Sequence, residues 1–145
     1  MNLFRNAAFL GACLAPLLGG PATAQTTAFD GFWDVTLNCP PFNEEDDEAN
    51  GYVHKWQAEI KNGTLRGVYG TIGNAGYHLL TGTVAPNGRA DLKLEGIVSS
   101  PSHAINNAYR GKSYSYKVRA DFEPTKGTGR RIGKRKCDFV FVAQK

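Results

Sequence analysis

The chain has 145 residues, and its 17 lysines and arginines exceed its 13 aspartates and glutamates by only four. So mild a positive charge does not predict a nucleic-acid partner, because nucleic-acid-binding domains concentrate much more basic charge. The length suits a single domain with a hydrophobic core, and it excludes a second domain of ordinary size.

The N-terminal segment indicates a secretory signal peptide. Arg5 lies in a short basic region, residues 7–18 are an apolar stretch, and Ala22-Thr23-Ala24 matches the A-x-A pattern that signal peptidase cuts. We predict a signal peptide over residues 1–25, cleaved after Ala24, and one mature domain over residues 26–145. The apolar stretch is too short to span a bilayer core of about 30 Å. We therefore expect no transmembrane segment and a periplasmic or secreted protein.

The three cysteines bear on this interpretation. Leu10-Gly11-Ala12-Cys13 resembles a bacterial lipobox, which makes a lipoprotein the alternative. The apolar stretch before Cys13 is very short, and apolar residues continue past it to Leu18, so we favour cleavage after Ala24. Signal removal leaves Cys39 and Cys137, and an oxidising compartment makes one disulfide between them the expected state.

From Phe29 onward, apolar and polar residues alternate with a period of two between Gly, Asn and Pro turns, which is typical of strands. Asn62-Gly63 predicts a hairpin, because its turn needs positive φ at both central residues. We expect strands over residues 30–39, 51–61, 64–71, 77–85, 89–98, 113–123 and 136–143, with a short one near 130–133. The five acidic residues Glu44–Glu48 predict a solvated loop, and Ser99–Lys112 a long connection with room for a short helical turn.

The two mature cysteines predict how the sheet closes. Cys39 ends the first expected strand and Cys137 begins the last, so antiparallel pairing of these strands brings the cysteines together. With 39 opposite 137, every pair joins two core-facing residues: Leu37 with Phe139, Val35 with Phe141, and Trp33 with Ala143. We therefore expect an all-β fold, an antiparallel up-and-down meander of 7–8 strands closed into a small barrel with first and last strands paired.

Two resemblances accompany this pattern. Gly31-Phe32-Trp33 resembles the G-x-W element of lipocalins and other calycin barrels, whose tryptophan closes one end of the barrel. A broader set comprises Phe29-Asp30-Gly31, Trp33-x-Val35-x-Leu37-x-Cys39, Gly127-Thr128-Gly129-Arg130-Arg131 and Cys137-x-Phe139-x-Phe141. This set resembles a group of small exported proteobacterial proteins of unknown function. The resemblance implies export and a disulfide, and it implies no activity.

The motifs of common enzymes are absent from the sequence. The mature chain has no G-x-S-x-G elbow, and its three histidines, His54, His78 and His103, lie on different segments without metal-binding spacing. The acidic run lacks the D-x-D-x-D-G spacing of a calcium loop. We expect no catalytic residues, no metal and no cofactor, and hence a protein that is not an enzyme.

A basic segment is the strongest surface feature in the sequence. It carries six basic residues and no acid: Lys126, Arg130, Arg131, Lys134, Arg135 and Lys136. Clustered positive charge attracts anionic partners such as envelope glycans, lipids or an acidic protein face. The alternative is structural, with Arg130 or Arg131 paired to Asp138 or to the acidic loop.

Core-facing residues of the expected strands offer a second candidate site. Strand alternation directs toward the barrel interior a set of aromatic residues and one histidine: Trp33, His54, Trp56, Tyr69 and Tyr116. This set raises the chance of a small interior pocket, although core packing is the commoner use of such residues.

These observations lead to three hypotheses for a monomeric protein. The first is a non-enzymatic exported binding module that engages an anionic envelope component or protein through the basic segment. The alternative is a secreted protease inhibitor that presents Pro40–Gly51 or Ser99–Lys112 as its binding loop. The third is a small-ligand carrier, which requires an internal cavity next to His54, Trp56 and Tyr116.

Overall fold

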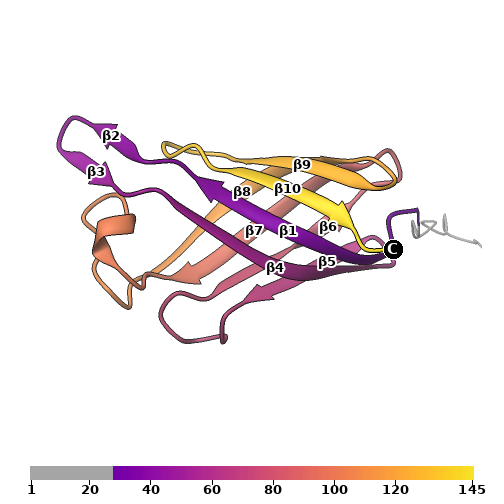
Figure 1. Ribbon diagram of the computed structural model, residues 1–145, viewed down its shortest axis with the longest axis horizontal. Helices are drawn as coiled ribbons and strands as arrows, with labels where there is room; N and C mark the ends of the chain where they lie inside the picture. The colour runs from indigo at the N-terminus through magenta and orange to yellow at the C-terminus, as the bar shows by residue number, and fades with distance from the viewer. Residues whose placement is uncertain (1–27) are drawn as a thin grey trace, which may run out of the picture.

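The computed structural model describes residues 28–145, and the predicted signal peptide and Cys13 lie outside this part of the chain. Eight antiparallel strands close into a barrel (Figure 1). They are β1 (Gly31–Cys39), β4 (Tyr52–Lys61), β5 (Thr64–Tyr69), β6 (His78–Val84), β7 (Arg89–Ile97), β8 (Ser113–Phe122), β9 (Lys126–Arg131) and β10 (Asp138–Ala143). The all-β meander is confirmed, and no helix within these residues is long and apolar enough to cross a membrane.

The pairing of β1 with β10 follows the predicted register. Trp33 lies opposite Ala143, and the same alignment pairs Val35 with Phe141 and Leu37 with Phe139. Cys39 and Cys137 form a disulfide with their Cα atoms 4.3 Å apart. Because β1 also pairs with β4, the first and last strands complete the barrel and leave no free edge in it.

Large apolar side chains fill one end of the barrel, which we call the closed end. Trp33 is 2% exposed and meets the ring of Phe122 edge-on, with 5.1 Å between centroids. Its Nε1 donates a hydrogen bond of 2.9 Å to the carbonyl oxygen of Phe29. Phe141 packs against Phe122 from the next layer, at 4.8 Å. The interior at this end is therefore occupied by the protein's own side chains.

The acidic segment is solvated as predicted, with four of its five acids exposed, but it is not an irregular loop. It forms a small hairpin of β2 (Phe42–Glu44) and β3 (Asp47–Ala49), which projects beyond the opposite end of the barrel (Figure 1). Asp47 is only 11% exposed, and its carboxylate accepts the backbone N–H of Asn106 at 3.0 Å. Partners in a distant connection thus order a run of acids that would otherwise repel one another.

The connection after β7 contains the expected short helical turn, the single 3-10 turn η1 (Pro101–His103). It lies beside the β2–β3 hairpin, and Asn50 donates its backbone N–H to the carbonyl of Ser102 at 2.7 Å. The two segments together lie at the end of the barrel opposite the beginning of β1 (Figure 1), the strand that carries Trp33 near its start. We call this the open end.

Strand β9 begins earlier and ends earlier than the predicted strand near residues 130–133. Its glycines allow the strand, because they face core residues that leave no room for a side chain. A Cβ on Gly127 would lie 3.0 Å from the Phe122 ring, and one on Gly129 would lie 3.1 Å from the Ala120 Cβ. The alternation of β9 then directs Arg131, which pairs with Val118, inward and Arg130 outward.

Candidate functional site

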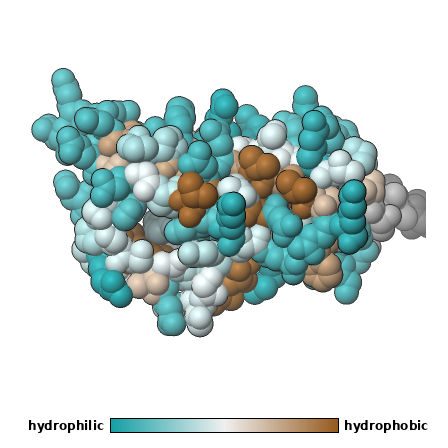
Figure 2. All heavy atoms as spheres, viewed as in Figure 1, coloured by the Kyte–Doolittle hydropathy of each residue, from teal (hydrophilic) through white to brown (hydrophobic). Residues whose placement is uncertain are grey.

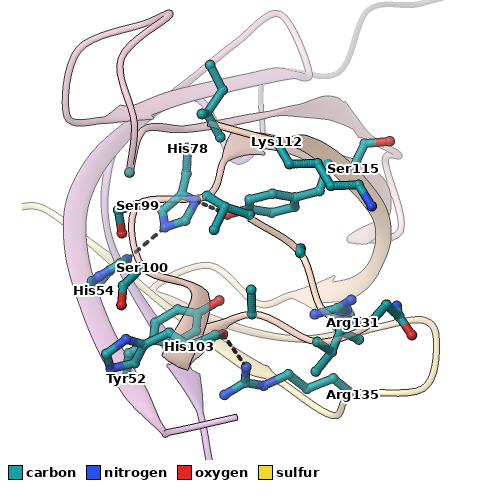
Figure 3. Close-up of a pocket in the computed structure, with 18 residues that line it drawn as sticks. Tyr52, His54, His78, Ser99, Ser100, His103, Lys112, Ser115, Arg131 and Arg135 are labelled. Atoms are coloured by element: carbon teal, nitrogen blue, oxygen red, sulfur yellow. Dashed lines mark hydrogen bonds between the residues drawn. The ribbon is translucent and has the colours of Figure 1, made fainter. Parts of the chain in front are cut away.

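The open end of the barrel contains a partly enclosed cavity of about 390 Å³ (Figure 3). Its walls come from β4, β6, β8 and β9, and the connection between β7 and β8 forms its rim. The apolar lining includes Tyr52, Ile97, Val98, Ala104, Ile105 and Ala108. The interior is therefore filled at one end and hollow at the other, a contrast that strand alternation alone does not predict.

Three side chains from three strands form a hydrogen-bonded chain along one wall of the cavity. Nδ1 of His54 lies 2.7 Å from Nε2 of His78, and Nδ1 of His78 lies 2.9 Å from the hydroxyl oxygen of Tyr114. Figure 3 shows both histidines on the same wall. The ring of Tyr69 stacks on His54 at 4.3 Å and 12°, which holds the imidazole in place from behind.

Burial keeps this chain uncharged at neutral pH. It lowers the pKa of His78 to about 4, and the neighbouring His54 contributes in the same direction. It also lowers the pKa of His54, with a further contribution from the charge of His103. Burial raises the pKa of the Tyr114 phenol well above its usual value. The wall thus presents polar groups without net charge.

The neutral state allows two directions for the hydrogen bonds, which differ in whether the Tyr114 phenol donates to Nδ1 of His78 or accepts from it. In the first, His78 carries its hydrogen on Nε2 and donates it to Nδ1 of His54. We assign this arrangement because His78 is the hydrogen-bond partner of Tyr114 within residues 28–145. The remaining ring N–H, on Nε2 of half-buried His54, is then free to donate to a bound molecule.

Glycine makes room for this arrangement. Gly96 on β7 lies directly opposite Tyr114 on β8. A Cβ on Gly96 would lie 2.6 Å from the Tyr114 hydroxyl oxygen, closer than nonbonded atoms approach. The phenol can therefore reach His78 only because residue 96 has no side chain.

The opposite wall carries arginines. The guanidinium of Arg131 lies over the ring of Tyr116, 4.2 Å from its centroid, and no carboxylate of residues 28–145 lies within 4.0 Å of Arg131. Arg135 is 2% exposed and is held by backbone carbonyls: it donates to His103 at 2.6 Å, to Asn50 at 2.7 Å and to Pro40 at 3.0 Å. Arg135 therefore ties together the segments that form the rim.

The six basic residues singled out in the sequence do not form one surface. Lys126 lies toward the closed end and pairs with Glu123 at 3.4 Å. Arg130 points outward and pairs with Asp138 at 3.2 Å, the structural alternative that the sequence offered. The other four divide between burial, ion pairing and exposure: Arg131 and Arg135 line the cavity, Lys134 pairs with Glu44 and Asp47, and Lys136 is exposed.

The five residues proposed for an interior pocket are also divided. His54 lines the cavity. Tyr69 and Trp56 lie behind the histidines, with the Trp56 ring 6.1 Å from that of His78, and Tyr116 lies under Arg131. Trp33 lies in the closed end and has no part in the cavity. Four of the five therefore surround the site, in two layers.

The sequence did not connect the histidines with one another, yet all three line this cavity. The signal that could have linked them is the inward-facing alternation of His54 on β4 and His78 on β6. Within the part of the chain that the structure describes, no group of three or more His, Cys, Asp or Glu side chains is arranged to hold a metal ion.

Comparison with known proteins found no matching family model, no matching curated protein and no matching solved structure. What the protein does is therefore inferred from the cavity itself.

Proposed function

We propose that this protein binds a small molecule in the open end of its barrel, without chemical conversion. The observation that carries the proposal is the cavity of about 390 Å³, which falls in the range of about 300–1,000 Å³ typical of small-molecule sites. Its walls combine apolar surface with a few fixed polar groups, which is how such sites orient a ligand.

Unpaired polar atoms support the same proposal. Four buried side-chain atoms within residues 28–145 have no hydrogen-bond partner, and all four belong to residues at or near the open end: Trp56 Nε1, Tyr116 Oη, Arg131 Nε and Arg135 Nε. Buried polar groups are nearly always paired, because an unpaired one costs about 1–3 kcal/mol. Two of the four residues, Arg131 and Arg135, line the cavity, so the region around it carries an energetic cost that packing alone does not explain.

The other two hypotheses have less support. A basic surface for envelope components is weakened because Arg130 and Lys134 already pair with acids and Arg135 is buried. An inhibitor needs an independently displayed loop, whereas Pro40–Gly51 and Ser99–Lys112 are bonded to each other at the rim. The disulfide fits an oxidising compartment and supports the proposal that the ligand is bound outside the cytoplasm.

The uncharged dye N-phenylnaphthylamine, whose fluorescence rises in apolar surroundings, can test the proposal. We expect the purified protein to bind it in a saturable way with one site. Replacement of Ala108 by tryptophan should fill the cavity and weaken dye binding at least tenfold, because Ala108 lines it. Circular dichroism should show that the variant keeps its strand content.

The outer face supplies a matched control. Figure 2 shows apolar residues among polar ones on the face that carries β1, β4 and β10, and Val53, Val140 and Val142 are each 46–55% exposed. The substitution Val142→Thr removes apolar surface there without altering the cavity, and it should change dye affinity less than twofold. Absence of saturable binding, or a greater loss with V142T than with A108W, would overturn the proposal.

A further inference from the structure

We infer that the ligand of this cavity is a small apolar monocarboxylate whose carboxylate pairs with Arg131. The inference rests on the proposed function, since it names the class of molecule that the open end binds. It comes from the charges that line the cavity, from the state of each arginine, and from the neutral wall opposite them.

The charge balance of the lining favours an anion. Its charged residues are Lys112, Arg131 and Arg135, and no aspartate or glutamate lines the cavity. Glu44 and Asp47, in the hairpin beside the rim, are paired with Lys134, which does not line the cavity. A partly enclosed space with only positive charge raises the local concentration of anions and disfavours cations.

Arg131 is the one arginine of the lining with a free hydrogen-bonding face. Both terminal nitrogens of Arg135 already donate to backbone carbonyls, so Arg135 has little left for a ligand. Arg131 has no acid within 4.0 Å among the described residues, and Nε is its only nitrogen that is both buried and unpaired, so its terminal nitrogens are the ones available to a ligand. The flat guanidinium of Arg131 suits the two oxygens of one carboxylate, and the charges of Lys112 and Arg135 add to the positive potential around it.

The contact with Tyr116 orients this guanidinium. Its central carbon lies 4.2 Å from the ring centroid, a distance at which cation–π attraction holds a flat group against the ring. A guanidinium fixed in one plane offers parallel N–H groups that match the two oxygens of a carboxylate. Lysine cannot reproduce this match, since its ammonium is a point charge on a flexible stem.

The wall opposite Arg131 accommodates the rest of the molecule. Burial keeps His54 and His78 neutral near pH 7. The apolar part of the ligand can therefore pack against them without removing water from a charged group. Ile97 and Ile105 provide apolar surface around the rim. Figure 3 shows Arg131 across the cavity from the two histidines, which leaves the space between them for the body of the ligand.

Displacement of bound N-phenylnaphthylamine tests the inference with three molecules that share one alkyl chain: decanoate, decanol and decyl phosphate. We expect decanoate to displace the dye at least tenfold more effectively than decanol and more effectively than decyl phosphate. Replacement of Arg131 by glutamine should weaken decanoate binding about 10–100-fold, the range expected for hydrogen bonds to a charged group. Circular dichroism should show that the variant keeps its strand content, and a dye titration of each variant supplies the dye affinity from which its decanoate affinity is calculated.

Arg130 is the matched control, because it is the neighbouring residue on the same strand and faces outward. R130Q removes the same charge from the protein and should leave decanoate binding within twofold of the wild type. R131K, which keeps the charge without the planar fork, should show an intermediate loss. If the dye binds but R131Q and R130Q affect decanoate equally, or decyl phosphate binds best, the carboxylate inference fails while the proposed function stands. If the dye itself does not bind, the proposed function fails first.

Discussion

His54 and His78 share a hydrogen bond of 2.7 Å between Nδ1 of the first and Nε2 of the second, although 24 residues separate them. Such a bond requires one nitrogen to carry a hydrogen and the other to offer a lone pair. It is therefore lost when both rings are protonated, and two adjacent positive charges would also repel each other. The histidine pair should consequently link the stability of the barrel to pH.

We predict that stability falls as the pH drops from about 6.5 to about 4. The folded His78 has a pKa of about 4 against the usual 6.5, so over this interval the unfolded chain gains a proton that the folded protein does not. The difference corresponds to about 3 kcal/mol at most, and the lowered pKa of His54 acts in the same direction. Urea denaturation at several pH values measures this loss.

The variant His78→Gln, which does not titrate, isolates the contribution of His78. It should be less stable than the wild type near pH 7, because the bonds to His54 and Tyr114 are altered, but its stability should depend less steeply on pH. If the variant and the wild type lose the same free energy of unfolding between pH 6.5 and pH 4, a group other than His78 causes the pH dependence.

Arg135 should be essential for the stability of the rim. Its guanidinium bonds three carbonyls from three segments, on Pro40, Asn50 and His103, and hydrogen bonds to charged groups contribute about 1.5–3 kcal/mol each. We expect Arg135→Gln to cost about 3 kcal/mol or more in the free energy of unfolding, because it leaves buried carbonyls unpaired. Thermal and urea denaturation provide the measurement.

Lys136 provides the comparison for this variant, since it is the next residue, has the same charge and is exposed. We expect Lys136→Gln to change stability by less than about 0.5 kcal/mol, as is usual for surface substitutions. Equal effects of R135Q and K136Q would indicate that net charge matters and that the carbonyl bonds do not.

The disulfide should stabilise the folded protein, and the size of this effect should depend on the length of the loop that it closes. Cys39 and Cys137 are 98 residues apart, and closure of a loop of that size restricts the unfolded chain by up to about 4.7 kcal/mol. The double variant C39A/C137A should therefore have a much lower midpoint of urea denaturation. The wild type under reducing conditions should shift by a similar amount, whereas reductant should not affect the double variant.

The two tryptophans should report separately on the two ends of the barrel. Trp56 lies near the cavity, 6.1 Å from the ring of His78, and Trp33 is buried in the closed end against Phe122. Decanoate binding should change the intrinsic fluorescence of Trp33→Phe, in which Trp56 is retained. It should leave the fluorescence of Trp56→Phe nearly unchanged. The opposite result would place the ligand at the closed end.

The sequence by itself determined the barrel, because the alternation of apolar and polar residues that specifies a strand is local and recurs along the chain. Alternation with a period of two specifies which side of each strand is buried, and a shift of one residue would expose every apolar side chain. The positions of Cys39 and Cys137 then left one register for β1 and β10, which pairs Leu37 with Phe139. Burial of apolar surface and a single possible disulfide are both readable from residue types and spacing.

Only the tertiary structure decided where the barrel is filled and where it is hollow. His54, His78 and Tyr114 meet because β4, β6 and β8 bring them to the same level along the barrel axis. Alternation predicts which side of a strand a residue faces, but it does not predict which residues of non-adjacent strands lie at the same level. Arg135 is buried because segments far from it in sequence supply its carbonyl partners. The free energy of a charged or polar side chain depends on such partners, so the candidate site depended on contacts that no local pattern encodes.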